Sequence, residues 1–572
     1  MDVKIHLRND HFPWTMLGDG DLMCWVKGDI FYNDEILQEN ETLSLLSRLK
    51  HSYDLNKEEF TDLLRGINGS FAFVVKTSTT LLCVVDRIRS IPIFYGKTTA
   101  GIIISDDANY LKDQINPMFD EQNGAEFLLT GYVTGPATLF EGIHQIQAGE
   151  CLAYAIMDNH LITHYYHQFW HGNYFSDSEK ELLDRLNTVF VRAYERLVAS
   201  LKEHNLTPVV PLSGGLDSRI IVAMLKRCGV DNVICFSYGR RNGREARISK
   251  QVAESLGYQW VFVGYSKRHC IGFQSKEMKD FRKYSANLAS SPHIQDFFAV
   301  KKLHEDRLIP ENAVFIPGHS GVIPGKPLPP VSTHPKEFSK ETFVQYVLNK
   351  HYFLWHWDHD TRLYQILKEK IESTVGDVPI IDSESWANAI ELFSLKERVA
   401  KFIINSVRVY EYFGYSWRMP LCDADVIDFF ERVPLKYREN GNLYEKYAAE
   451  RLFVNAFRDL RRIDCTTPIS DKLRIISAKN KIMHIIWSRV NFFNTGSFDP
   501  KAAIFWAITG DNPGIFEIKN KCFGYNPESH FDSELMNEIM VHSSKTGFIP
   551  IVNSLGAHAF LNEVIEEGNT SE

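Results

Sequence analysis

Residues 209–219 read Val-Val-Pro-Leu-Ser-Gly-Gly-Leu-Asp-Ser-Arg, and they carry the strongest fold signal in the chain. The apolar run at the start ends in a Ser-Gly-Gly turn, and an apolar-periodic segment with few helix breakers follows. This order predicts a buried strand, a glycine turn and the first turn of a helix. Strand and helix signals keep alternating downstream, so the stretch indicates an α/β fold.

The turn itself predicts a binding site for phosphate groups. Gly214 and Gly215 allow successive backbone N–H groups to point into one concavity, where the helix N-terminus adds partial positive charge. Ser213 and Ser218 add hydroxyl donors, whereas Asp217 places a carboxylate among them. Because a carboxylate repels a polyphosphate unless a divalent cation lies between them, the turn predicts a nucleotide pyrophosphate with Mg²⁺, and Asp217 as the metal ligand.

Other glycine turns differ from this one in composition. Glycines between a strand and a helix can serve close packing alone, which is the structural alternative. The Ser-Gly-Gly-x-Asp-Ser pattern lacks the Lys of a Walker loop and the third Gly of a dinucleotide fingerprint. The pattern resembles the pyrophosphate loop of ATP pyrophosphatases, which adenylate their substrates.

The composition limits the class of protein. A chain of 572 residues fits two or three domains, and 44% hydrophobic with 24% charged residues is typical of globular proteins. The net charge of −9 argues against bulk nucleic-acid binding. No apolar run reaches membrane length, no signal pattern opens the sequence, and the nine cysteines include no Cys-x-x-Cys pair. We therefore expect a cytoplasmic protein without a membrane partner.

The first 165 residues have a β-rich pattern. Short apolar runs recur between Gly, Asn and Asp turns, at 22–26, 71–75, 81–85 and 101–105. Helical segments are predicted at residues 36–50 and 57–65. Mixed elements of this spacing predict a layered sheet sandwich with flanking helices. A polar linker is predicted at 171–178, ending in a helix cap.

From residue 178 the pattern changes to alternating helices and strands. A long amphipathic segment precedes the strand at Val209, and further strands are predicted at 232–237 and 260–263. This alternation predicts a doubly wound parallel sheet, with ligands at the carboxyl ends of the strands. The Ser213 turn and Ser237 both lie at such ends. Beyond about residue 335 the chain is predicted to be mainly helical.

With these residues in place, the chain resembles the asparagine synthetase family in its broad sense. Besides the loop, the resemblance rests on residues 26–33, 86–95, 131–143 and 419–423, and on Leu443–Tyr447. It implies an α/β protein with an αββα Ntn-type glutamine amidotransferase-like domain over residues 1–170. An ATP-pyrophosphatase domain with a helical C-terminal part is expected over 178–572.

The resemblance also implies site residues. Lys446 matches the family Lys that stabilises the adenylation transition state. Tyr410 and Glu411 match a Tyr–Glu pair that prepares the amine in lactam-forming relatives, although helical spacing also fits core packing for Tyr410 and a surface ion pair of Glu411 with Arg408. The ATP-binding residues implied are Leu212, Ser213, Gly214, Gly215, Asp217, Ser218, Ser237 and Gly318.

Three positions depart from the family pattern. Asp2 stands where glutamine-hydrolysing members have a cysteine, and Cys24, the first cysteine, lies in an apolar run typical of a core strand. Val322 replaces an Asp that helps to hold Mg²⁺ and pyrophosphate. His319 replaces a Glu, and it is predicted to be either a loop residue without catalytic duty or a phosphate contact or proton carrier.

These residues predict an ATP-dependent carbon–nitrogen ligase without glutaminase activity. It would adenylate a small-molecule or peptide carboxylate and transfer the acyl group to ammonia or an amine, using ATP and Mg²⁺. Asparagine, an amidated sugar acid, a modified peptide or a lactam would each fit as product. The alternatives are a catalytically weakened binding or scaffold homologue, and a lasso-type peptide macrocyclase or β-lactam synthetase-like enzyme. No nucleic-acid partner is expected, and the assembly considered is a homodimer.

Overall fold

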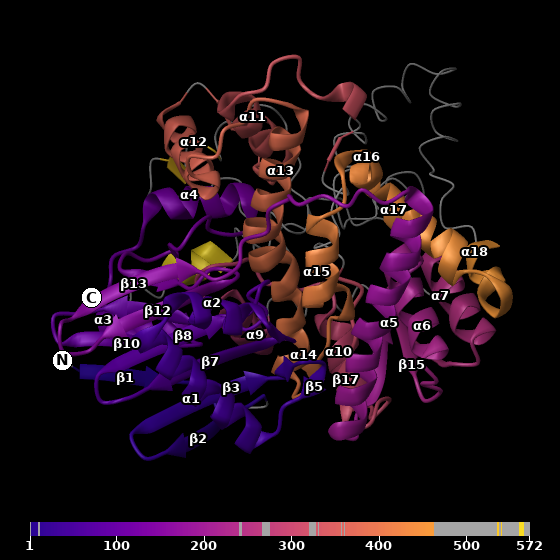
Figure 1. The fold of residues 1–572 in the computed structure, drawn as a ribbon, viewed down its shortest axis with the longest axis horizontal. Helices are drawn as coiled ribbons and strands as arrows, with labels where there is room; N and C mark the ends of the chain where they lie inside the picture. The colour runs from indigo at the N-terminus through magenta and orange to yellow at the C-terminus, as the bar shows by residue number, and fades with distance from the viewer. Residues whose placement is uncertain are drawn as a thin grey trace.

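The computed structural model places most of the chain (Figure 1). The residues it describes are 2–9, 12–239, 243–265, 275–319, 328–329, 331–355, 357–359, 361–462, 535–536, 539 and 560–565. No helix among them is both long enough and apolar enough to span a bilayer.

Two stacked sheets form the first part of the chain, on the indigo side of Figure 1. The six-stranded antiparallel sheet runs in the order β13 (His160–Tyr165), β12 (Glu150–Ala155), β8 (Thr80–Val85), β7 (Phe71–Lys76), β3 (Leu22–Gly28) and β2 (Thr15–Asp19). The four-stranded sheet runs β1 (Asp2–His6), β10 (Gly101–Ser105), β9 (Phe94–Lys97) and β11 (Ile143–Gln145). A small third sheet comprises β5 (Glu35–Ile36), β4 (Phe31–Tyr32) and β6 (Ile67–Asn68).

Burial on both faces explains why β7 is a continuous apolar run. Successive strand residues point to opposite faces. Phe71 and Phe73 belong to the core beneath α1 (Glu39–Leu55) and α2 (Lys57–Arg65), whereas Ala72 and Val74 belong to the core shared with the four-stranded sheet. The helices α3 (Ala108–Ile115) and α4 (Glu121–Thr130) follow β10. The predicted sandwich with flanking helices is confirmed, with α1 shifted a few residues from 36–50.

The second part contains a five-stranded parallel sheet. Its order is β16 (Gln259–Gly264), β15 (Ile234–Gly239), β14 (Thr207–Pro211), β17 (Ala313–Phe315) and β18 (Ser416–Trp417). The helices around it are α5 (Glu179–Glu203), α6 (Leu216–Arg227), α7 (Arg244–Ser255), α9 (Lys276–Ala286) and α10 (Phe297–Glu305). The chain builds β15 and β16 on one side of β14 and β17 on the other, so β14 lies at the switch point where open α/β sheets bind ligands.

The predicted linker ends at a helix cap. The Ser178 hydroxyl accepts from the Glu181 N–H and the Glu181 carboxylate accepts from the Ser178 N–H, a capping box that begins α5. The linker packs on the second part, because Gly172 N–H donates to the Glu431 carbonyl at 3.1 Å and His171 is buried beside it. Segment 171–178 is therefore held in place.

The helical part predicted beyond residue 335 is confirmed up to residue 462. Its longer helices are α11 (Lys340–His351), α12 (Arg362–Val375), α13 (Ser383–Phe393) and α15 (Ala424–Glu431). After α13 the helix continues as a π-helical segment, Ser394–Ile403, a rare form that recurs at functional sites. The shorter helices are α14 (Arg408–Tyr412), α16 (Leu435–Arg438), α17 (Asn442–Tyr447) and α18 (Arg458–Arg462).

Candidate active site

The Ser213–Ser218 loop joins β14 to α6, as predicted. The Ser213 hydroxyl accepts from the Gly215 N–H at 3.1 Å, and the Ser218 hydroxyl accepts from the Ser213 N–H at 3.2 Å. The helix α6 begins at Leu216, and Gly215 before it provides no side-chain cap. Its first N–H groups therefore lack a side-chain acceptor, which is the arrangement that binds anions.

Gly318 lies directly against this loop. A Cβ added to Gly318 would come within 3.2 Å of the Ser218 nitrogen and 3.5 Å of the Asp217 Cβ. The end of β17 therefore brings a residue from another strand to the head of α6, because parallel strands end at the same edge of a sheet. A role of Gly318 in ATP binding stays a prediction, and its position is compatible with one.

The Asp217 carboxylate is oriented by a residue that the sequence pattern did not single out. The Tyr444 hydroxyl, in α17, donates to Asp217 Oδ1 at 2.9 Å. Tyr444 is fully buried. A tyrosine two residues before Lys446 carries no signal of such a contact. Only the packing of α17 against α5 brings it to the loop.

His319 follows Gly318 and lies near the same carboxylate. Its Nε2 is 2.6 Å from the Ser406 hydroxyl. Burial, and the proximity of His293, lower the pKa of His319 to about 3, while Asp217 opposes this shift. The imidazole is therefore neutral at physiological pH, so it can exchange hydrogen bonds but supplies no positive charge to a phosphate. Val322 lies outside the described residues.

Leu212 follows the end of β14, and Ser237 lies in the second half of the neighbouring strand β15. Leu212 is buried, and its N–H donates to the Phe236 carbonyl at 2.8 Å. The buried hydroxyl oxygen of Ser237 has no hydrogen-bond partner within the described part of the chain. Buried polar atoms are nearly always satisfied, so this oxygen marks a place for a ligand or a water. The role of Ser237 in ATP binding stays a prediction.

Lys446 lies against the N-terminal end of α5. Its Nζ pairs with both carboxylate oxygens of Glu179, at 2.7 and 2.8 Å, and both side chains are about one-third exposed. In this state the ammonium contacts the first residue of α5, and no contact with the Ser213–Ser218 loop is seen among the described residues. The predicted catalytic role of Lys446 would require the side chain to leave Glu179.

Tyr410 and Glu411 both lie in the interior. The Tyr410 ring is buried and stacks on Phe315 at 4.1 Å between centroids, as core packing predicts. Glu411 accepts from Arg408 Nη1 with both oxygens, at 2.7 Å, and from Trp417 Nε1 at 2.8 Å. The surface interpretation of the Arg408–Glu411 pair is wrong, because both side chains are buried.

The first part of the chain offers no activated thiol in residues 1–170. Its three cysteines, Cys24, Cys83 and Cys151, lie on β3, β8 and β12 and are fully buried. Burial raises the pKa of the Cys24 thiol to about 12 and raises the pKa of the other two as well. The prediction that Cys24 is a core residue is confirmed. Asp2 lies at the start of β1, paired with Gly101.

Comparison with known proteins agrees with this two-part architecture. Residues 51–170 match the family described as glutamine amidotransferase domain, and residues 195–307 match asparagine synthase. The chain is 27% identical to carboxyethyl-arginine beta-lactam-synthase of Streptomyces clavuligerus over 241 residues, which are 40% of this chain and 42% of the relative. The match thus spans less than half of the relative's length.

Two solved structures also match, at a TM-score too low to support an argument. A glutamine phosphoribosylpyrophosphate amidotransferase from B. subtilis complexed with ADP and GMP has a TM-score of 0.20 and 12% identity, over 44% of this chain and 72% of that one. An allosteric regulatory enzyme of purine biosynthesis has a TM-score of 0.19 and 12% identity, over 44% and 62%. The two family matches, with the loop on β14, agree with the resemblance to the asparagine synthetase family: residues 51–170 are similar to a glutamine amidotransferase domain and residues 195–307 to asparagine synthase.

Proposed function

We propose that this protein is an ATP-dependent carbon–nitrogen ligase that adenylates a carboxylate and passes the acyl group to an amine. The observation that carries the proposal is the Asp217 carboxylate at the head of α6, fixed by the Tyr444 hydroxyl and adjoined by Gly318. An acid placed beside uncapped helix N–H groups is poorly suited to a phosphate alone and well suited to a phosphate with a divalent cation.

Different groups of the loop would bind the pyrophosphate oxygens of ATP and the Mg²⁺ ion. The N–H groups at the start of α6 and the hydroxyls of Ser213 and Ser218 would hold the pyrophosphate oxygens of ATP. Asp217, with serine hydroxyls nearby, offers the oxygen donors that Mg²⁺ prefers. The cation, when bound, would neutralise charge on the leaving pyrophosphate. Gly318 places no side chain against Asp217 and Ser218.

The proposed reaction has two steps. The substrate carboxylate attacks the α-phosphorus, the bond to the β-phosphate oxygen breaks, and pyrophosphate leaves. An amine attacks the acyl-adenylate carbonyl, loses a proton and displaces AMP. Lys446, released from Glu179, would offset charge on the α-phosphate in the first step.

The amine is proposed to come from a source other than glutamine. Glutamine hydrolysis needs a thiolate nucleophile, and the three thiols of residues 1–170 are buried with raised pKa values. The curated relative is named for forming a β-lactam, an amide closed within one molecule. That name favours intramolecular amide formation as the narrower candidate.

Pyrophosphate release tests the proposal. The purified protein is incubated with Mg²⁺-ATP and a panel of amino acids, sugar acids and β-amino acids, and pyrophosphate and AMP are measured. Asp217→Asn should abolish release, whereas the control Asp231→Asn, an exposed carboxylate paired with Lys226, should leave it unchanged. Absence of ATP binding and of release with every acid would favour the scaffold alternative.

A further inference from the structure

A cavity of about 440 Å³ lies away from the ATP loop, between the first part of the chain and the helices α12 and α13. Its wall comes from the 131–143 passage, the end of β13 and residues 168–170 after it, the end of α12, the end of α13 and the start of the π-helical segment. None of the lining residues belongs to the Ser213–Ser218 loop. The volume falls within the range of small-molecule sites, about 300–1,000 Å³.

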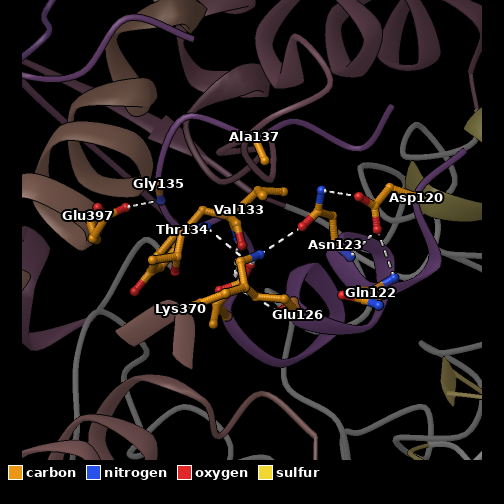
Figure 2. Close-up of polar contacts among 12 residues, drawn as sticks. Asp120, Gln122, Asn123, Glu126, Val133, Thr134, Gly135, Ala137, Lys370 and Glu397 are labelled. Atoms are coloured by element: carbon orange, nitrogen blue, oxygen red, sulfur yellow. Dashed lines mark hydrogen bonds and ion pairs between the residues drawn. The ribbon is translucent and has the colours of Figure 1, made fainter. Parts of the chain in front are cut away.

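Glu397 lines this cavity with a carboxylate that is only half satisfied. Its side chain is 0% exposed, and Oε2 accepts from the Gly135 N–H at 3.0 Å, as Figure 2 shows, and from Lys401 Nζ. The second oxygen, Oε1, is buried and has no hydrogen-bond partner in the described parts of the chain. A buried carboxylate oxygen without a donor is costly, so this atom calls for a donor from a ligand.

The neighbouring buried carboxylate shows that the fold can satisfy such a group. Glu126, also in Figure 2, accepts from the Tyr352 hydroxyl at 2.9 Å with Oε1, and from the Thr134 N–H at 3.2 Å and from Lys370 with Oε2. Both of its oxygens are occupied by protein donors. Glu397 differs because its free oxygen belongs to a residue that lines a cavity.

Lys396 brings a positive charge to the same cavity. The residue is 8% exposed, and its ammonium lies over the Tyr165 ring at 4.5 Å. Across the residues that the structure describes, no carboxylate lies within 4.0 Å of its Nζ. Desolvated ammonium groups are normally paired, and a ring face replaces only part of an anion's stabilisation. The cavity therefore presents one cation and one hydrogen-bond acceptor from consecutive residues.

The rest of the wall contains polar side chains, Gln168, Ser373 and Thr374, as well as apolar ones. Trp170, Val375, Val378 and Leu392 line the cavity beside these two charged groups. Apolar surface combined with a few placed polar groups is the usual form of a small-molecule site. The matching ligand has an anionic group and an ammonium close together, and an apolar body.

We propose that this cavity binds an α-amino acid with an apolar side chain. Its carboxylate pairs with Lys396, its ammonium donates to Glu397 Oε1, and its side chain packs against Trp170 and Leu392. The π-helical segment, which ends at Ile403, is followed directly by a 3-10 segment, Ile404–Val407, and Ser406 of this segment bonds His319 beside the ATP loop. The site is thus linked to the loop by two consecutive helical segments.

Calorimetry on the nucleotide-free protein tests the site with three probes. L-Phenylalanine should bind, and 3-phenylpropionate, which lacks the ammonium, and phenethylamine, which lacks the carboxylate, should each bind at least about tenfold more weakly. L-Leucine serves as a second amino acid probe. Absence of binding by both amino acids, or equal binding of all three phenyl compounds, would overturn the proposal.

Variants locate the binding. Lys396→Met keeps the aliphatic stem and removes the charge, and Ser373→Trp, at an exposed position of the wall, fills the mouth. Each should weaken L-phenylalanine binding at least about tenfold. The control Lys368→Met, whose ammonium pairs with Glu341 outside the cavity, should bind normally. Asp217→Asn should also bind L-phenylalanine normally. The binding test therefore remains valid even if the proposed ligase function is wrong. Normal binding by both cavity variants would place the amino acid elsewhere.

Discussion

The Tyr444 hydroxyl donates to Asp217 Oδ1 at 2.9 Å and joins two residues 227 positions apart. Burial, and the nearby Asp217 charge, raise the pKa of Tyr444 well above its usual value, so the hydroxyl keeps its proton and acts as donor. The Tyr444 ring packs against Phe190 of α5. One oxygen of the proposed metal ligand is therefore held by a rigid, buried side chain.

Tyr444→Phe is expected to slow pyrophosphate release without unfolding the protein. The ring keeps its packing, and the lost bond to a charged group is worth about 1.5–3 kcal/mol, which corresponds to a rate loss of roughly 10- to 100-fold. Steady-state pyrophosphate release measures it. The control is Tyr447→Phe in the same helix, whose buried hydroxyl contacts Met224 Sδ at 3.6 Å. Equal losses of rate in both variants would contradict a specific role for the bond between Tyr444 and Asp217.

Gly318→Ala is expected to weaken ATP binding about tenfold. The new Cβ would lie 3.2 Å from the Ser218 nitrogen, so the loop must shift by a few tenths of an ångström. Titration with a fluorescent ATP analogue measures the change. Gly172→Ala is the matched control, because a Cβ there meets no atom within 4 Å. Unchanged affinity of the Gly318 variant for the ATP analogue would mean that nucleotide binding does not depend on the present shape of the loop.

The backbone of the loop was predictable because its signals are local. An apolar run, two glycines and an apolar-periodic segment specify β14, the turn and α6 within about twenty residues. The position of Gly318 also followed, since parallel strands end at one edge. The continuous apolar run of β7 likewise predicted a strand, and the structure adds that both of its faces are buried.

Side-chain partners were not predictable where they depend on packing of distant helices. The bond between Tyr444 and Asp217 requires α17 to lie against α5, and no periodicity specifies that contact. The Arg408–Glu411 spacing is the same for a surface pair and a buried one. The burial of both side chains, and the Trp417 indole that donates to the same carboxylate, distinguish the two in the structure.

Mutation can distinguish the role of Lys446 from that of Glu179. If Lys446 offsets charge in the adenylation transition state, Lys446→Met should lower the rate of pyrophosphate release about 100-fold or more. Glu179→Gln should change the rate less than about fivefold, because an ion pair this exposed contributes about 0–1 kcal/mol. Single-turnover measurements at saturating ATP compare them. Similar small effects in both variants would reduce Lys446 to a structural residue.

Glu411→Gln is expected to destabilise the protein by about 3–5 kcal/mol, because it leaves the Arg408 charge buried without its partner. The double variant Arg408→Met with Glu411→Leu should recover much of this loss, since it removes both charges. Urea unfolding measures all three proteins. If Glu411→Gln instead keeps full stability and loses only activity, Glu411 acts on the amine, as the family resemblance implies.

His351 gives a prediction for pH dependence. The side chain is 2% exposed, and neither ring nitrogen has a hydrogen-bond partner among the described residues. Burial, with Arg398 and Lys350 nearby, holds the pKa of His351 well below its usual value of 6.5. The unfolded chain therefore binds a proton below pH 6.5 that the folded protein does not bind, and stability falls as the pH is lowered through that value.

His351→Leu should therefore stabilise the protein, and more so in acid. Removing an unsatisfied buried imidazole is worth about 1–3 kcal/mol at pH 7.5, and the gain should grow at pH 5.5, where the unfolded wild type is protonated. Urea unfolding at the two pH values measures the difference, with the exposed His160→Leu as control. A gain that is the same at both values, or larger at pH 7.5, would show that His351 is protonated in the folded protein.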